Sequence, residues 1–378
     1  MAAALGLAKT GIRTRVFEQT AMPAEVGAGL QLGPNAVTAL RWLGAAALLE
    51  GRAVAPRAIE LRRGNDGRKV GTIPLGTEMM ARYGAPYWVV HRADLLAALV
   101  AAAAVEPLIS IEYGRRITTF ESVTEGVDVG MDMGGSARGS ALIAADGVWS
   151  TVRRQVFPDI TARPSGYVAY RTVVDAADAQ DLGFGDTVTV LFATGAHLVS
   201  YPVSAGKAVN IVAIVSSGWR NEGWNAPAAA VDVIRALKPF AFAPALARLA
   251  DRQPWLQWSL AAPTVLPRLA TDRVAFVGDA GHAMLPFLAQ GAAMALEDAV
   301  ELSSALRPSS ANLQSGLARY DERRRARACR VQLQSSRNGA IFHFSGPVGW
   351  VRDLAIGLET AVAPLNRWDW LYGWKPPT

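Results

Sequence analysis

Residues 274–302 read VAFVGDAGHAMLPFLAQGAAMALEDAVEL, and they decide the fold predicted for the whole chain. The apolar, β-branched run at 274–277 predicts a buried strand. Gly278 and Asp279 end this strand with a turn and a carboxylate. After a loop, a run of Ala, Met, Leu and Glu from residues 290–291 onward predicts a helix, because these are strong helix formers. The segment is therefore predicted to be a strand–turn–helix unit of an α/β protein.

The turn and the helix start suit a ligand that carries hydroxyl groups and partial negative charge. The Asp279 carboxylate can accept a hydrogen bond from a sugar-alcohol hydroxyl, and the helix start offers free backbone N–H groups at the positive end of its dipole. Gly291 lets a flat ring approach the backbone closely. A bare Gly-Asp pair would favour an ordinary strand–helix connection, but the whole string favours a ligand site.

Length and composition bound the class of protein. The chain has 378 residues, 51% of them hydrophobic, which allows two domains and a sizeable core. No apolar run reaches the roughly 18 residues of a membrane span, and the start, MAAALGLAKTG, lacks the basic region of a secretory signal. The single Cys329 excludes an internal disulfide, and four scattered histidines predict no metal site. We expect a cytoplasmic protein that does not bind a membrane.

Part of the net charge of +6 comes from the basic residues of the segment 321–330, DERRRARACR. Such a run could bind nucleic acid, but the sequence has no interleaved aromatic platform and no zinc pattern. A solvated helix face is the favoured interpretation, so we expect no nucleic-acid partner. A basic surface could also attract anionic substrates and a dinucleotide.

The N-terminal residues match the second half of a dinucleotide-binding βαβ unit. Residues 1–10 predict the later turns of a helix, Gly11 its C-cap, and residues 13–18 a strand that ends in Glu18. In such a unit an acid at this place bonds a ribose hydroxyl, about 20 residues after a G-x-G-x-x-G turn. Counting back that far passes Met1, so we expect this chain to lack the first strand and its glycine fingerprint.

Two further strings complete the pattern. Residues 27–35, GAGLQLGPN, follow the acidic Glu18 and so cannot supply the phosphate loop. Residues 146–153, DGVWSTVR, predict a turn after a buried strand and then a helix, with Arg153 aimed at phosphate. Together with residues 274–302, these two strings resemble motifs of the single-component FAD-dependent aromatic hydroxylases. This family of flavoprotein monooxygenases includes the salicylate hydroxylase-like and 3-hydroxybenzoate 6-hydroxylase-like enzymes. In that family the segment that corresponds to residues 27–35 passes beside the flavin ring.

The resemblance implies an α/β fold with a Rossmann-like FAD-binding domain of the para-hydroxybenzoate hydroxylase type and an inserted, mainly antiparallel β-sheet substrate domain. Alternating patterns at 167–174, 187–192, 198–203 and 208–215 agree with that sheet. The expected limits are residues 1–164 and 265–314 for the two parts of the FAD-binding domain, 165–264 for the substrate domain and 315–378 for a C-terminal helical region. FAD is the expected cofactor, and NADH or NADPH the co-substrate.

The resemblance also assigns roles to residues of this chain. Asp279, after Gly278, would hold the FAD ribitol, and the helix start would face the flavin N1–C2=O edge. Arg92 and Asp146 would serve the FAD phosphates, and Glu18 the ribose. The cofactor-binding residues expected from the resemblance and the N-terminal pattern are Glu18, Arg92, Asp146, Gly278, Asp279, Gln290, Gly291 and Ala292.

A histidine and a tyrosine in the substrate domain are the expected catalytic pair. His197 and Tyr201 lie four positions apart in HLVSYPV and would face the same side of a strand. Together they could supply a base and a hydrogen-bond relay for a phenol; the alternative is a packed aromatic ring with an edge histidine. Related hydroxylases carry H-x-x-x-Y here, which favours the catalytic reading. The expected substrate-site residues are Tyr170, Arg171, Pro286 and Phe287.

The implied reaction is hydroxylation of a small phenolic or hydroxy-heteroaromatic acid with NAD(P)H and O2, through a flavin C4a-hydroperoxide. His282 is expected to be structural. We expect a monomer or homodimer. The alternative is a truncated or pseudo-enzyme flavoprotein shell that binds FAD weakly and has no hydroxylase activity, which the missing fingerprint favours.

Overall fold

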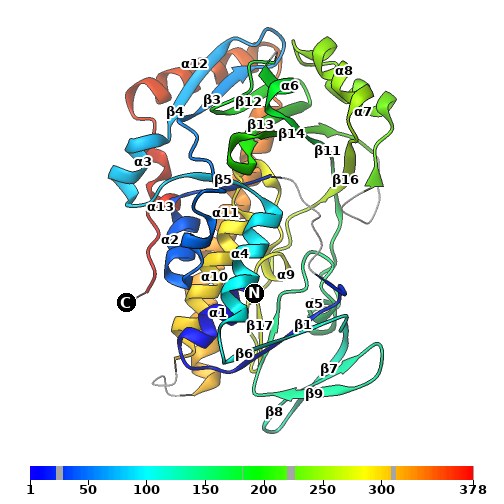
Figure 1. The fold of residues 1–378 in the computed structure, drawn as a ribbon, viewed down its shortest axis with the longest axis vertical. Coiled ribbons are helices and arrows are strands. Elements are labelled where there is room, and N and C mark those ends of the chain that lie inside the picture. The colour runs from blue at the N-terminus through cyan, green and yellow to red at the C-terminus, as the bar shows by residue number, and fades with distance from the viewer. Residues whose placement is uncertain (23–28, 181, 219–225, 308–311, 378) are drawn as a thin grey trace.

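An eight-stranded sheet forms the upper part of the molecule (Figure 1). The structure, a computed structural model, describes residues 1–22, 29–180, 182–218, 226–307 and 312–377. In spatial order the sheet runs β15-β16-β11-β14-β13-β12-β3-β4. Its strands are β3 (Ala58–Arg63), β4 (Lys69–Pro74), β11 (Pro164–Asp175), β12 (Val188–Ala193), β13 (Ala196–Val203), β14 (Ala208–Ser216), β15 (Ala226–Pro227) and β16 (Leu256–Ala261).

The sheet includes a hairpin from outside the segment expected to form it. β12 pairs in parallel with β3, with Val188 opposite Ile59, whereas the other neighbouring strands of the sheet run antiparallel. The sequence analysis expected this sheet only within residues 165–264, so β3 and β4 lie outside the predicted segment. Pairing between distant segments leaves no trace in a local pattern, because alternation reports only that one face is buried.

The two faces of the sheet belong to different cores, because side chains alternate along a strand. Leu198 of β13 shares a core with Val233 of α7 (Ala230–Leu237) and Leu246 of α8 (Ala243–Arg252). Tyr201 and Val203 face the opposite way, into the core that also contains Phe276 and Met294. One face of β13 is therefore turned toward the rest of the molecule.

The lower part contains two short pairs of parallel strands and a small antiparallel sheet (Figure 1). One pair is β1 (Thr14–Glu18) with β6 (Ile109–Tyr113), and the other is β10 (Leu142–Ala144) with β17 (Val274–Phe276). All three residues of β17 are buried, as its sequence predicted. The antiparallel strands are β7 (Ile117–Val123), β8 (Gly126–Met131) and β9 (Ser136–Gly139).

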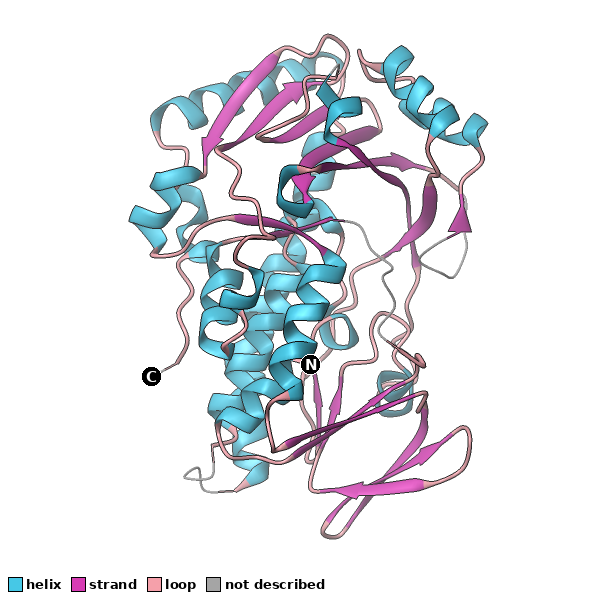
Figure 2. Cartoon of the chain, viewed as in Figure 1, coloured by secondary structure: helices cyan, strands magenta, loops and turns pink. Residues whose placement is uncertain are grey.

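A layer of helices fills the side of the molecule between the sheets (Figure 2). At its centre α10 (Gly291–Ala305) packs against α1 (Ala2–Lys9), α2 (Pro34–Leu43) and α11 (Leu313–Phe342). Gly11, at φ +83°, follows the end of α1, in agreement with its predicted role. The remaining helices are α3 (Gly76–Tyr83), α4 (Arg92–Ala104), α5 (Thr151–Val156), α6 (Ala176–Gln180), α9 (Asp279–His282), α12 (Gly346–Val362) and α13 (Asp369–Tyr372).

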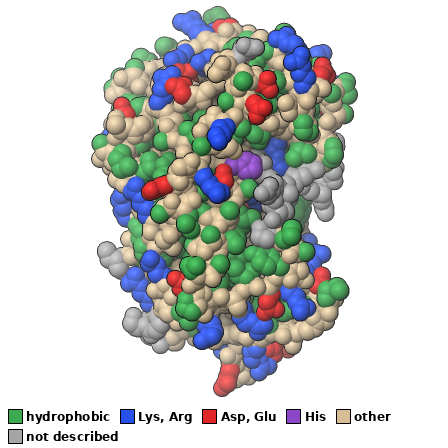
Figure 3. Space-filling model, in the orientation of Figure 1, with side chains coloured by type: hydrophobic (Ala, Val, Ile, Leu, Met, Phe, Trp, Pro, Cys, Tyr) green, Lys and Arg blue, Asp and Glu red, His purple; other side chains and the backbone are tan. Residues whose placement is uncertain are grey.

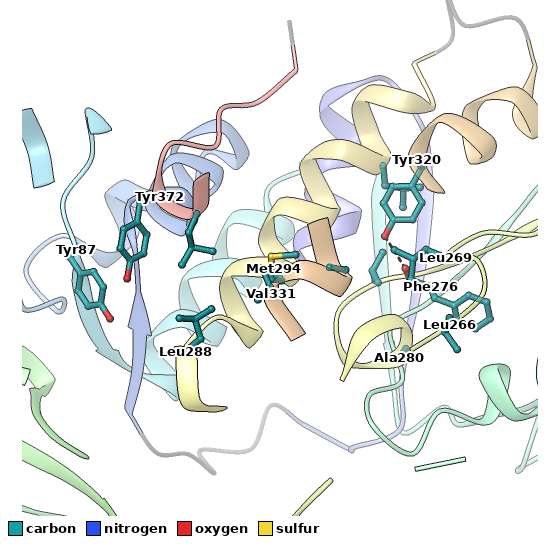
Figure 4. Close-up of a cluster of buried hydrophobic side chains, with 14 of the residues drawn as sticks. Tyr87, Leu266, Leu269, Phe276, Ala280, Leu288, Met294, Tyr320, Val331 and Tyr372 are labelled. Atoms are coloured by element: carbon teal, nitrogen blue, oxygen red, sulfur yellow. Dashed lines mark hydrogen bonds between the residues drawn. The ribbon is translucent and has the colours of Figure 1, made fainter. Parts of the chain in front are cut away.

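The buried core behind β17 joins strand, helix and loop. Phe276, Met294 and Val331 pack in one cluster (Figure 4). Tyr320 of α11 enters the same cluster, and its hydroxyl donates a hydrogen bond to the main-chain carbonyl of Phe276 at 2.8 Å (Figure 4). A buried hydroxyl needs such a partner, so α11 is held in register with the strand that precedes the Gly278 turn. Among the described residues, no helix is long and apolar enough to span a membrane.

Candidate functional site

The turn after β17 is fixed from behind by a buried carboxylate. Gly278 adopts φ +58°, a backbone conformation that favours glycine, and its N–H donates to Asp298 Oδ2 at 2.8 Å. The same oxygen lies 2.6 Å from His282 Nε2. The nearby His282 and Arg324 outweigh burial and lower the pKa of Asp298 to about 2. This arrangement agrees with the structural role expected for His282.

Asp279 has the surroundings of a ligand-binding carboxylate. Burial raises its pKa, against the opposing fields of His282, Arg92 and Arg153. Asp279 is partly buried, and within the described part of the chain no donor makes a hydrogen bond to its carboxylate. A cofactor hydroxyl would supply the missing donor, so the site fits the ribitol that the sequence leads us to expect.

The start of α10 also leaves room for a flat ligand. A Cβ atom added to Gly291 would meet nothing within 4 Å. The first N–H groups of any helix have no partner within it, so those of Gly291 and Ala292 face this space at the positive end of the dipole. Gln290, the N-cap, is buried and accepts a hydrogen bond from Asn35 Nδ2 at 3.0 Å. The helix start is thus held in place by the end of the 27–35 segment.

Arg153 joins the two motifs instead of reaching a phosphate. Its side chain is 1% exposed and donates to the carbonyls of Asp279 at 3.3 Å, Ala280 at 3.0 Å and Val148. The expectation that Arg153 is aimed at phosphate is therefore wrong. The physical reason is that two buried loops bring main-chain carbonyls together, and a guanidinium with five donors can satisfy several of them.

The other expected phosphate-site residues lie at the ends of elements. The Asp146 carboxylate accepts hydrogen bonds from the N–H groups of Thr151 at 2.7 Å and Val152 at 3.2 Å, and so caps α5. Arg92 is exposed as the first residue of α4, and its charge acts on Asp279 and on Arg171. A capping role for Asp146 is now evident, and a cofactor role for both residues stays a prediction.

Glu18 ends β1, as its strand pattern predicted. Its carboxylate accepts hydrogen bonds from Thr20 N at 2.9 Å and Thr20 Oγ1 at 3.1 Å. These bonds hold the carboxylate at the end of the strand, and its contact with a ribose stays a prediction.

His197 and Tyr201 share one face of β13, but His197 has a partner that the sequence analysis missed. His197 Nδ1 lies 2.9 Å from His343 Nε2, at the C-cap of α11. Burial, with a smaller contribution from His343, lowers the pKa of His197, and burial lowers the pKa of His343 to about 4. Both rings are therefore neutral at pH 7. A lone histidine in an apolar tail carries no sequence signal for such a pairing.

Tyr201 touches the segment expected beside the flavin. A Cβ atom on Gly29 would overlap the Tyr201 ring, so glycine allows β2 (Gly29–Leu32) to approach β13. The N–H of Gly29 also donates to Asn210 Oδ1 at 3.1 Å. Burial raises the pKa of Tyr201, which keeps its hydroxyl protonated. Gly27 and Ala28, in the same predicted segment, lie outside the described residues.

Neighbouring residues of β11 point in opposite directions. Arg171 is 6% exposed, stacks at 4.5 Å over the ring of Trp258 and feels the positive charge of Arg92. Burial lowers the pKa of Arg171 to about 10. Tyr170 packs in the other core, with α7 and α8. The prediction that Tyr170 lines the same cavity as Arg171 is wrong, because adjacent residues of a strand face opposite sides.

Phe287 meets His197 from the loop before α10. Their ring centres lie 5.0 Å apart, and Tyr167 lies edge-on to Phe287 at 5.3 Å. Phe287 is buried, whereas Pro286 is exposed. The structure thus brings Phe287 to the catalytic candidate, and the substrate contact predicted for Pro286 stays untested.

The basic segment 321–330 is not simply a solvated face. Arg324 is fully buried, with Nη1 2.6 Å from Glu297 Oε2 and Nε 2.7 Å from Asp298 Oδ1. Arg327 also pairs with Glu297. The solvated-face interpretation is therefore wrong for these two arginines, which neutralise acids of α10. On the face shown in Figure 3, basic side chains are interspersed with acidic ones.

Comparison with known proteins gives matches over most of the chain. A family model described as FAD binding domain matches residues 1–335. The 3-hydroxybenzoate 6-hydroxylase 1 of Aquipseudomonas alcaligenes is 32% identical, over 99% of this chain and 94% of its own length. Salicylate hydroxylase of Pseudomonas putida is 33% identical, over 96% and 86%. The crystal structure of Klebsiella pneumoniae HpxO with FAD and uric acid has a TM-score of 0.83 at 26% identity and covers 97% of this chain and 92% of its own.

Proposed function

This chain belongs to the family of FAD-dependent aromatic monooxygenases with the para-hydroxybenzoate hydroxylase fold, and we propose that it hydroxylates a small phenolic or hydroxy-heteroaromatic acid. FAD is its cofactor and NAD(P)H its electron donor. The observation that carries the substrate proposal is the position of His197 and Tyr201. Tyr201 faces from β13 into the core that contains Phe276 and Met294, and His197, on the same face of the strand, contacts Phe287 in the loop before α10.

FAD, when bound, supplies the redox chemistry with NAD(P)H and O2. In our proposal Asp279 accepts a hydrogen bond from the ribitol, and the start of α10, with Gly278, Gln290, Gly291 and Ala292, receives the polar edge of the ring. Glu18 would bond the ribose, and Arg92 and Asp146 would lie near the phosphates. The unpaired, partly buried Asp279 carboxylate and the open space at Gly291 support this arrangement.

His197 is proposed as the base that takes the phenol proton. If His197 Nδ1–H donates to His343 Nε2, then the lone pair of His197 is at Nε2, where it can accept a proton. The hydrogen bond at His197 Nδ1 thus fixes the tautomer of the ring, as such hydrogen bonds do for histidines in other sites. Tyr201, kept protonated by burial, would donate to the resulting phenolate oxygen.

Arg171 and Phe287 are proposed to orient the substrate. The Arg171 guanidinium faces the same side of the sheet as Tyr201 and can bind a carboxylate with two parallel hydrogen bonds. Phe287 and Phe342 surround His197 with rings at 5.0 and 5.3 Å, which excludes water from the base. Asp298, behind the Gly278 turn, already pairs with His282 and Arg324, so its charge is neutralised before a substrate binds.

The test is a substrate series with the flavin-loaded protein. Oxidation of NADH and NADPH is followed with salicylate, 3-hydroxybenzoate and hydroxynicotinates, and the products are identified. Benzoate, which has no hydroxyl to deprotonate, is the control. We expect faster NAD(P)H oxidation and a hydroxylated product for at least one hydroxy acid. Tight FAD binding without any such product would instead support the flavoprotein shell that lacks hydroxylase activity.

A further inference from the structure

The buried His197 ring has one hydrogen-bond partner among the described residues. The ring is 1% exposed, and the rings of Phe287 and Phe342 lie against it at 5.0 and 5.3 Å. These two rings can neither accept nor donate a proton. The third ring beside it belongs to His343, with 2.9 Å between His197 Nδ1 and His343 Nε2. When a substrate covers the Nε2 side of His197, the hydrogen-bonded path from His197 to solvent therefore leads through His343.

His343 lies between this pocket and the surface. It is partly exposed at the C-cap of α11, and residues 344–348, which follow it, are all exposed. Its Nε2 is in contact with His197. Its Nδ1 has no hydrogen-bond partner within the described part of the chain, and it is not one of the fully enclosed polar atoms that lack a partner. Water therefore has access to Nδ1, so the ring connects His197 on one side with solvent on the other.

The surroundings of the pair do not stabilise a positive charge on it. Among the described residues no acid pairs with His343. Tyr167 of β11 lies edge-on to its ring at 5.4 Å, and Arg352 of α12 donates to the carbonyls of Phe342 and Phe344 on either side of it. Burial lowers the pKa of His197 and lowers that of His343 to about 4. Because burial disfavours the charged form of a histidine, a proton should pass through the pair and not remain on it.

We propose that His343 is the proton exit of the active site, through which the phenol proton taken by His197 leaves for solvent. The inference rests on the proposed role of His197 as the base. His343 itself does not touch the substrate and acts through His197. It is therefore a different role from holding the His197 tautomer, which any hydrogen-bond acceptor at this position could fulfil.

The step consists of three proton transfers. The phenol O–H bond breaks and an N–H bond forms at His197 Nε2, the Nδ1–H proton of His197 moves to His343 Nε2, and the Nδ1–H proton of His343 moves to water. Each ring gains one proton and loses one, so both stay neutral and the positive charge appears in solvent. When the product phenolate is protonated, the same transfers in reverse restore both tautomers.

The first test separates the exit from a structural contact. His343→Gln can still accept from His197 Nδ1 but cannot pass the proton on, and His343→Ala leaves a gap that added imidazole can enter. Phe344→Ala, in the same turn and 39% exposed, is the control. The reduced, flavin-loaded proteins are saturated with 3-hydroxybenzoate or salicylate and mixed with oxygenated buffer, and the product is followed by rapid quench.

General acid–base catalysis contributes roughly 10²- to 10⁴-fold in all, so loss of the exit should slow hydroxylation by about 10-fold or more in both His343 variants. FAD content and the rate of Phe344→Ala should match wild type. Millimolar imidazole should restore His343→Ala but not His343→Gln. Pyrazole, which has nearly the same size but is a far weaker base, should restore neither.

Three results would overturn the proposal. A wild-type rate for His343→Gln would mean that His343 only orients His197, and the base would stand without the exit. Rescue of His343→Ala by pyrazole as well as by imidazole would mean that filling the gap is enough. A wild type that forms no product from either acid would instead overturn the proposed function, and the exit with it.

The second test needs no variant except to assign signals. In protein labelled with ¹⁵N-histidine, NMR reports which nitrogen of each ring carries the proton, and His343→Gln identifies the pair. We expect His197 to carry its proton on Nδ1 in the free protein and on Nε2 in the complex with 3-hydroxybenzoate. A His197 protonated on both nitrogens in the complex would show that the proton stays on the base, and would overturn the exit. An unchanged tautomer would contradict the deprotonation itself.

Discussion

His197 Nδ1 and His343 Nε2 lie 2.9 Å apart, and this contact joins the centre of the large sheet to the end of the longest helix. Arg352 fixes the turn that carries His343, because its Nη1 donates to the carbonyls of Ile341, Phe342 and Phe344 at 3.1 to 3.3 Å. The partner of the proposed base is thus positioned by a buried guanidinium on α12.

The two histidines should make stability depend on pH. Their pKa values are lowered in the folded state, so the unfolded chain binds more protons once the pH falls below about 6.5. Stability is therefore lost as the pH falls from about 6.5 toward 4. His343→Gln, which can still accept from His197 Nδ1, should reduce this loss. Urea unfolding at several pH values measures it, and an unchanged slope for the variant would contradict the pairing.

His197→Asn should separate hydroxylation from cofactor binding. The variant keeps a polar group in the aromatic pocket but has no base near pH 7. General-base catalysis contributes roughly 10²- to 10⁴-fold, so hydroxylation should fall by about 10²-fold or more while FAD content and flavin reduction stay close to wild type. Stopped-flow reduction and product yield measure the two steps. Loss of FAD with normal hydroxylation after reconstitution would exclude this role.

Asp279→Asn should weaken FAD binding. A hydrogen bond to a charged group contributes about 1.5 to 3 kcal/mol, which corresponds to ~10- to 100-fold in the dissociation constant. Asp272→Asn, an exposed acid on the loop before β17, is the matched control. Flavin fluorescence titration of the apoprotein gives both constants. Equal FAD affinity for Asp279→Asn and the control would argue against a ribitol contact.

Arg324→Leu should destabilise the fold itself. It leaves the buried Asp298 and Glu297 without their shared cation, and breaking a buried ion pair costs about 3 to 5 kcal/mol. Arg323→Leu removes a side chain that is 43% exposed and 3.8 Å from Glu301, so it should cost about 1 kcal/mol or less. Denaturant unfolding compares the two. Equal free energies of unfolding would mean that the buried network contributes little.

Local patterns predicted the elements but not their neighbours. The β17 strand, the Gly11 cap and the Gly278 turn could be predicted because each depends on a few adjacent residues. His343, the burial of Arg324 and the pairing of β3 with β12 depend on contacts between distant segments. Tyr170 was different, since strand alternation alone places it opposite Arg171, and the sequence contained the information needed to reject it.

Gly29→Ala should disturb hydroxylation without unfolding the protein. The added methyl group would overlap the Tyr201 ring and come within 2.8 Å of Val203 Cγ1, so Tyr201 or β2 must shift. If Tyr201 holds the phenolate oxygen, the displaced ring should leave NAD(P)H oxidation intact and lower the yield of hydroxylated product per NAD(P)H. Gly185→Ala is the control, because a Cβ atom there meets nothing within 4 Å. Simultaneous measurement of NAD(P)H consumed and product formed gives this yield for each variant. If Gly29→Ala and Gly185→Ala give the same yield as wild type, the contact between β2 and Tyr201 does not position the substrate.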